Sequence, residues 1–94
     1  MKIASVGDFR RAVRHGQYAW PGGYPCYFVM ADGEALSFDA AKTERRYILE
    51  ALRDRAHGYP NGGWLPASFE INWEDNDLLC AHTNERIPAA YGGD

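Results

Sequence analysis

The clearest pattern in the chain is a pair of apolar runs on either side of Asp32-Gly33, between Tyr24 and Phe38. An Asp-Gly pair tolerates the positive φ angles of a tight turn, so the segment predicts a β-hairpin with a two-residue loop. That loop length sets the register, because each residue then has one partner across the hairpin. The expected pairs are Ala31 with Glu34, Val29 with Leu36, and Tyr27 with Phe38.

This register divides the hairpin into two faces. One face holds the six paired side chains, four of them large and apolar, and we expect it to face the core. The other face holds Cys26, Phe28, Met30, Ala35 and Ser37. It is more apolar than a face in contact with water usually is. Phe28 and Met30 are therefore the expected contact of a homodimer that packs two sheets together.

Two segments show helical spacing. In residues 1–15, apolar side chains recur at Val6, Phe9 and Val13. Ser5 is a suitable N-cap and Gly16 a suitable stop. Residues 39–57 predict one long helix, capped by Ser37 or Asp39 and ended at Gly58. Its expected inward stripe is Ala41, Ile48, Ala51, Leu52 and Arg55, with Tyr47 at the edge.

Residues 67–73 alternate between apolar and polar side chains, which predicts a third strand. Phe69, Ile71 and Trp73 are expected to face in, and Ser68, Glu70 and Asn72 to face out. A polar turn and two short extended pieces, 78–80 and 86–88, follow. The order α-β-β-α-β predicts one α+β domain over residues 1–94. It consists of an antiparallel sheet of three to four strands, one long helix packed on it, and a short N-terminal helix.

Two turn-rich loops each carry a tryptophan. Residues 16–25 contain Trp20 and Tyr24 among two prolines and three glycines, and residues 58–66 contain Trp64 in a similar run. The similarity indicates that the two loops meet at one end of the sheet. Two interpretations of Trp20 stay open. It caps the hydrophobic core, or it is an exposed anchor for a protein partner, since Trp and Tyr are enriched among the side chains that dominate interfaces.

Composition and charge narrow the class of protein. No apolar stretch approaches the ~18 residues of a membrane span, and the N-terminus lacks a signal-peptide run, so we expect a cytoplasmic protein. Residues 1–57 hold nine Lys and Arg against seven acidic residues, whereas residues 58–94 hold one Arg against six. The two parts therefore carry net charges of +2 and −5. A nucleic-acid binder is normally more basic overall, and the acidic second part favours a basic partner.

No set of residues matches a catalytic or cofactor motif. Cys80 and His82 supply only one pair of zinc ligands, and a structural site needs four. The acidic run 74–77 lacks the glycine and the spacing of a calcium loop. Cys26 lies in an apolar strand, where a buried and inert thiol is expected. We therefore predict no enzyme activity, no metal, no cofactor and two free cysteines.

Five segments together resemble small uncharacterised proteins of tailed phages and prophages. They are Asp8 to Ala12, Tyr18 to Pro25, Asp32 to Ser37, Ile71 to Asp75, and Ala89 to Tyr91. The run Trp-Pro-Gly-Gly-Tyr-Pro is the most specific of them. By analogy with small phage accessory proteins, the resemblance implies stoichiometric binding to a host machine, as anti-CRISPR and other anti-defence inhibitors bind.

These observations lead to one principal expectation about function. We expect a non-enzymatic protein that binds and inhibits a host protein with a basic surface, in the cytoplasm of the host cell. The expected contact residues are Trp20, Tyr24 and Trp64 as anchors and Glu70, Glu74, Asp75 and Asp77 as charges. Two alternatives stay open: a self-associating structural or regulatory module, and a nucleic-acid contact through Arg10, Arg11, Arg14, Arg45 and Arg46.

Overall fold

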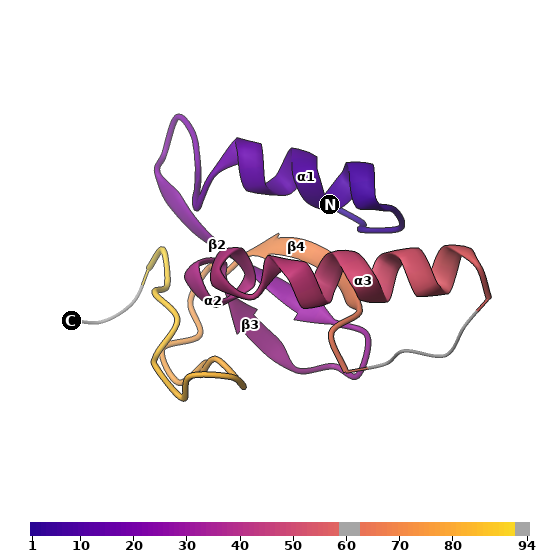
Figure 1. Ribbon diagram of the computed structural model, residues 1–94. Helices are drawn as coiled ribbons and strands as arrows, with labels where there is room; N and C mark the ends of the chain where they lie inside the picture. The colour runs from indigo at the N-terminus through magenta and orange to yellow at the C-terminus, as the bar shows by residue number, and fades with distance from the viewer. Residues whose placement is uncertain (59–62, 92–94) are drawn as a thin grey trace.

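The computed structural model describes residues 1–58 and 63–91, and its architecture is the predicted α+β class (Figure 1). Within these described residues, an antiparallel sheet of four strands is combined with three helices. The elements are α1 (Val6–His15), β1 (Tyr18–Ala19), β2 (Tyr24–Met30), β3 (Ala35–Ser37), α2 (Phe38–Thr43), α3 (Arg45–Ala56) and β4 (Pro66–Ile71). Residues 59–62, which belong to the second predicted aromatic loop, and residues 92–94 lie outside the described part.

β2 is the central strand of the sheet. It pairs with β3 and with β4, and its first residues pair with β1. The chain start lies along β4, where the Ile3 N–H donates to the Ala67 carbonyl at 2.9 Å and the Phe69 N–H to the Met1 carbonyl at 2.7 Å. The first residues therefore extend the sheet instead of starting a helix, and they protect an edge of β4.

The β2–β3 hairpin forms where predicted, but its loop has three residues. The Met30 N–H donates to the Glu34 carbonyl at 2.8 Å, so Ala31, Asp32 and Gly33 make the turn. Gly33 has a φ of 89°, the left-handed conformation that ends such a loop. The predicted two-residue turn is therefore wrong, and the strand pairing differs from the prediction by one residue.

The shifted register places the other face of β2 in the core. Cys26, Phe28 and Met30 are 4, 0 and 5 % exposed, whereas Tyr27 and Val29 are only half-buried. The Phe28 ring lies among aromatic side chains of α1, α2 and β4. The predicted core face of β2 is therefore wrong. The predicted dimer contact through Phe28 and Met30 is also wrong, because both side chains are covered by the protein's own core.

The predicted helix over 39–57 is divided into α2 and α3. Glu44, with φ −100° and ψ 22°, separates them. Ser37 is the N-cap of α2, since its hydroxyl accepts the Ala40 N–H at 3.1 Å. The stripe of Ala41, Ile48, Ala51 and Leu52 is buried as predicted. Arg55 is exposed, contrary to the prediction, because the last turns of α3 extend beyond the sheet (Figure 1).

α1 is capped by Ser5 and Gly16, as predicted, and it places Phe9 in the core. The Ser5 hydroxyl accepts the Asp8 N–H at 3.1 Å, and the Asp8 carboxylate accepts the Ala4 N–H at 2.9 Å. α1 and α3 lie side by side with opposite chain directions (Figure 1). Both contribute to the core against which Phe28 packs.

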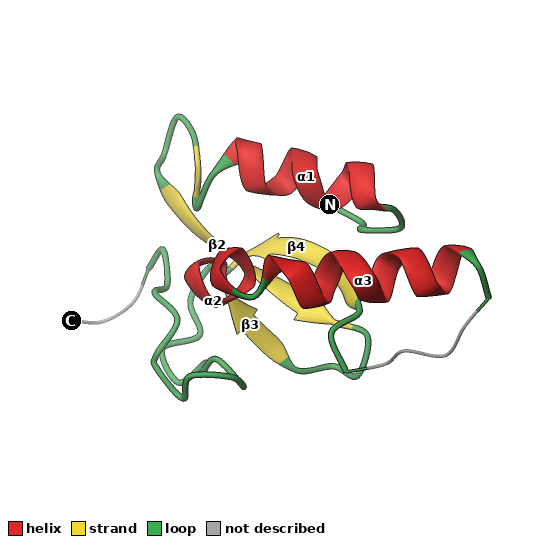
Figure 2. Cartoon of the chain, in the orientation of Figure 1, coloured by secondary structure: helices red, strands yellow, loops and turns green. Residues whose placement is uncertain are grey.

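After β4 the chain is irregular and runs back beside β3 (Figure 2), where the Ala81 N–H donates to the Ala35 carbonyl at 2.8 Å.

Candidate functional site

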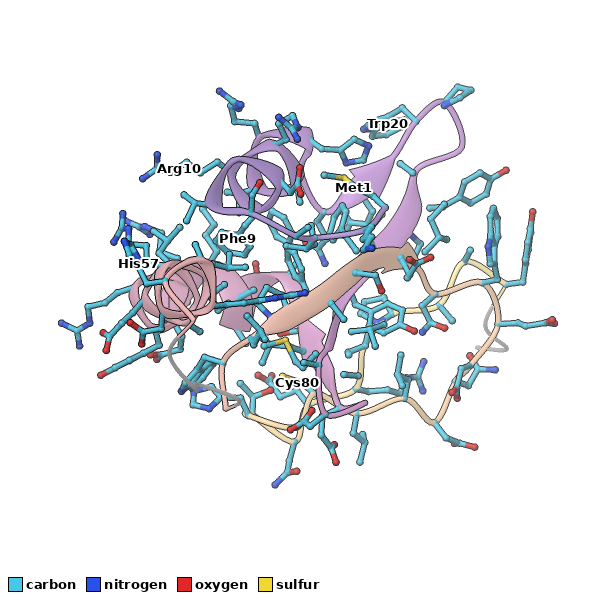
Figure 3. All side chains as sticks on the ribbon, turned by 90° about the vertical axis from the view of Figure 1, so that its right-hand side faces the viewer. Met1, Phe9, Arg10, Trp20, His57 and Cys80 are labelled. Atoms are coloured by element: carbon cyan, nitrogen blue, oxygen red, sulfur yellow. The ribbon has the colours of Figure 1, made fainter. Side chains whose placement is uncertain are left out.

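Trp20 lies at the tip of the turn between β1 and β2, away from the core (Figure 3). Its side chain is 75 % exposed. The ring packs on Gly23, where an added Cβ would come within 3.4 Å of it. Of the two interpretations of Trp20, the core cap is therefore wrong and the exposed position is confirmed.

Three aromatic side chains, Tyr24, Trp73 and Tyr91, gather beyond the end of β4, and we call them the aromatic cluster. The Tyr24 ring centroid lies 4.8 Å from that of Trp73 and 6.2 Å from that of Tyr91. Trp73 and Tyr91 are stacked with an interplanar angle of 14°. A hydrogen bond with Tyr24 raises the pKa of Tyr91. The cluster is thus an arrangement of rings from three separate parts of the chain.

The backbone holds the aromatic cluster in place while leaving two of its rings accessible. The Tyr91 N–H donates to the Trp73 carbonyl at 2.7 Å. Trp73 is nevertheless 46 % exposed and Tyr91 65 % exposed. The prediction that Trp73 faces the core is wrong, because β4 ends two residues earlier, at Ile71.

Asn72 is the buried polar anchor beneath the aromatic cluster. The prediction placed it in solvent, but it is 4 % exposed. Its side-chain NH₂ donates to the carbonyls of Asp75, Ile87 and Pro88 at 3.0, 3.4 and 3.1 Å. Its side-chain oxygen accepts the Asp75 N–H at 3.1 Å. These bonds connect the start of the acidic loop, residues 74–77, to the segment that leads to Tyr91.

The predicted acidic contact residues are all exposed. Glu74, Asp75 and Asp77 follow directly on Trp73 in the acidic loop. Glu70 lies on β4, where its carboxylate is 3.3 Å from the N-terminal ammonium group. Burial raises the pKa of Tyr27, and the negative charges of Glu70 and Asp75 raise it further. Tyr27 lies on β2 directly opposite Glu70 of β4, and the negative charge of Asp75 also acts on it.

Trp64 belongs to a different part of the surface. It precedes β4, whose first residue Pro66 pairs with Met30 at the far end of β2 from Tyr24. Its ring stacks on Tyr47 at 5.6 Å and meets the edge of His82 at 5.2 Å. The prediction that the two tryptophan-bearing loops meet at one end of the sheet is wrong.

The sulfur of Cys80 lies inside the fold, beneath a surface hollow of about 380 Å³ that Glu44 and His82 help to line. Cys80 itself is 0 % exposed and does not line the hollow. The His82 ring is 3.7 Å from the Glu44 carboxylate. Within the described residues, no group of three or more His, Cys, Asp and Glu side chains is placed to hold a metal ion.

The Cys80 thiol has a distinctive hydrogen-bond environment. Burial opposes ionisation of the thiol and raises its pKa. Hydrogen bonds from the backbone N–H of Ser37 and from the side chain and backbone of Thr83 favour the thiolate. These hydrogen bonds outweigh burial, so the pKa of Cys80 is lowered from 9.0 to about 7. The Ser37 N–H lies 3.4 Å from the sulfur. Burial raises the pKa of the other thiol, Cys26.

We expect Thr83→Val to raise the pKa of Cys80 from about 7 towards 9.0, because the valine keeps the shape and removes the hydroxyl donor. Ultraviolet titration of the thiolate measures this in a Cys26→Ser background. Because folding lowers this pKa, the free energy of unfolding of the unsubstituted protein should increase between about pH 7 and pH 9, and less so in Thr83→Val. An equal pKa in both proteins would contradict the assigned hydrogen bond.

The described part of the chain contains no helix with the length and apolar character needed to cross a membrane. The resemblance to proteins of tailed phages stays a prediction. Comparison with protein-family models, with curated proteins and with solved structures gives no significant match in any of the three.

Proposed function

We propose that this protein binds a protein partner with a basic surface through the aromatic cluster, the acidic loop and Trp20. The observation that supports this most strongly is the exposure of Trp73 and Tyr91 in fixed positions. Large aromatic side chains dominate the binding energy of many interfaces. Rings that are already ordered lose little conformational entropy when a partner covers them, so they favour binding.

The charge next to the aromatic cluster supports a basic partner. Glu74, Asp75 and Asp77 are exposed, and no ion pair to any of them is found among the described residues. A partner with Lys and Arg would supply the missing charges, and the attraction would speed association. Glu70 contributes less, because the N-terminal ammonium group already neutralises part of its charge.

The proposed action is stoichiometric binding without catalysis. Cys26 is buried and its pKa is raised, as is typical of a structural cysteine. The pKa of Cys80 is lowered, but the residue is 0 % exposed, so a substrate has no direct access to its sulfur. The resemblance to phage accessory proteins supports the more specific proposal that the partner is a host protein and that binding inhibits it. An anti-CRISPR or other anti-defence inhibitor in the host cytoplasm is the role that fits this resemblance.

Capture of partners from a host lysate, quantified by mass spectrometry, tests the proposed surface with matched variants. Glu74→Lys with Asp77→Lys should reduce recovery of the specific partner at least about tenfold, because two favourable charges become repulsive. Asp75 is left intact, since its carboxylate accepts the Asp77 N–H. The control is Glu34→Lys with Glu50→Lys, which changes net charge equally at exposed positions elsewhere. Equal loss in both variants would count against the acidic loop.

A further inference from the structure

A groove of about 390 Å³ lies between α1 and α3. Its floor is apolar and consists of Phe9, Val13 and Leu49, while Arg10, Arg14 and Arg45 line it as cations. Phe9 and Arg10 both belong to α1, and Figure 3 shows them on a different part of the molecule from Trp20. The groove therefore does not overlap the tip that carries Trp20 and is independent of the proposed function.

The three arginines of the groove have no carboxylate partner among the described residues. Arg11, the neighbouring arginine on α1, forms an ion pair with Asp8. In contrast, no ion pair to Arg10, Arg14 or Arg45 is found within residues 1–58 and 63–91. None of the described residues that line the groove is acidic. It therefore combines an apolar floor with uncompensated positive charge, and fits a ligand that is both apolar and anionic.

We propose that an acidic amphipathic helix of a partner protein docks in this groove. Helices recognised in this way place apolar side chains at i, i+3 or i+4, and i+7 into a groove between elements. The ten residues of α1 and twelve of α3 correspond to about 15 and 18 Å of helix, enough to lie against two to three turns of the ligand. Glu and Asp beside its apolar stripe would pair with the arginines.

Nucleic acid fits the groove less well. Single strands are bound by stacking of bases on exposed aromatic rings, but Phe9 is 1 % exposed and the remaining floor is aliphatic. The whole chain carries a net charge of −3, which repels a polyanion at long range. A short helix with a few local carboxylates avoids most of this repulsion while using both the floor and the cations.

Fluorescence anisotropy with labelled synthetic peptides tests the groove. The probe is a helix-stabilised peptide with leucine at i, i+3 and i+7 flanked by glutamates. One comparison peptide has lysines in place of the glutamates, and another has serines in place of the leucines. We expect saturable binding of the acidic amphipathic peptide and at least about tenfold weaker binding of both comparison peptides, because each lacks one of the two required properties.

Matched variants locate the binding. Arg10→Glu with Arg14→Glu should weaken binding of the acidic peptide at least about tenfold, whereas Arg46→Glu with Arg53→Glu, an equal charge change at exposed positions outside the groove, should have a much smaller effect. Methyl NMR signals of Val13 and Leu49 should shift on titration. Absent binding, equal losses in both variants, unshifted methyl signals, or tighter binding of a single-stranded oligonucleotide than of the peptide would each overturn the proposal.

Discussion

Replacing Phe28 by alanine is expected to lower the free energy of unfolding by about 3–5 kcal/mol, the cost of truncating a large buried aromatic. The Phe28 side chain is 0 % exposed. Its ring centroid lies 5.4 Å from Phe9, 4.7 Å from Phe69 and 6.4 Å from Phe38. The substitution therefore opens a cavity where α1, α2 and β4 meet β2. The loss is a large part of the ~5–15 kcal/mol that stabilises a typical domain.

Urea unfolding followed by circular dichroism measures this loss. The matched control is Tyr27→Ala, the adjacent residue on β2, which is only half-buried. We expect a clearly smaller loss at Tyr27, since part of its ring already contacts water. A greater loss at Tyr27 than at Phe28 would contradict the three-residue loop and support the register expected from a two-residue turn.

The second large effect is expected for Asn72→Asp, which should lower the free energy of unfolding by about 3–5 kcal/mol at neutral pH. The aspartate keeps the shape but loses the NH₂ group that donates to three carbonyls. It also places a buried carboxylate against those carbonyl oxygens, which raises its pKa in the folded state. The acidic loop and the segment leading to Tyr91 should loosen together.

The pH dependence of the free energy of unfolding distinguishes the effect of the new charge from the effect of the lost hydrogen bonds. Because the folded-state pKa of the new carboxyl is raised, its penalty should be largest at neutral pH and decrease as the pH falls and the group becomes protonated. Asn72→Ala removes the same bonds without adding a charge, and its loss of about 2–4 kcal/mol should not show this decrease. Thermal unfolding at several pH values gives the comparison. Parallel curves for the two variants would contradict the assigned environment of Asn72.

The parts of the fold that could be predicted are those set by near neighbours in sequence. The Ser5 and Ser37 caps each act on a backbone N–H three residues ahead. Gly16 follows α1 with a φ of 92°, a positive value that glycine adopts without a Cβ clash. These local signals, with the alternation in β4, were enough to establish the α+β class.

The hairpin register could not be settled by its turn sequence. Asp32-Gly33 suits a two-residue turn, but glycine also suits the last position of a three-residue loop. The Asp32-Gly33 sequence is therefore compatible with a two-residue loop and with a three-residue loop. The choice is made by packing, because the observed register sets Phe28 opposite both Leu36 and Phe69 and buries it under the helices.

The candidate site was predicted only in part, for a similar reason. Exposure of Trp20 and of the acidic loop follows from turn-rich sequence. Tyr24 belongs to the site because its ring packs against Trp73 and Tyr91. These two residues lie about 50 and 70 positions further along the chain, and the sequence did not identify them as site residues. Asn72 bonds to carbonyls 15 and 16 residues further on. The sequence offered one signal for this anchor, the polar residue Asn72 at the end of an alternating strand. Asp75 follows three residues later, and this spacing suits a hydrogen bond between the Asn72 side chain and the backbone.

The exposed rings of Trp73 and Tyr91 are the proposed principal contact with the partner. The affinity of the purified partner, measured by isothermal titration calorimetry, tests it most directly. Trp73→Ala with Tyr91→Ala should weaken binding at least about 30-fold, the effect of removing a strong contact residue. Trp73→Phe with Tyr91→Phe should retain most of the affinity, because it keeps the aromatic surface. Unchanged affinity in the alanine variant would contradict the claim.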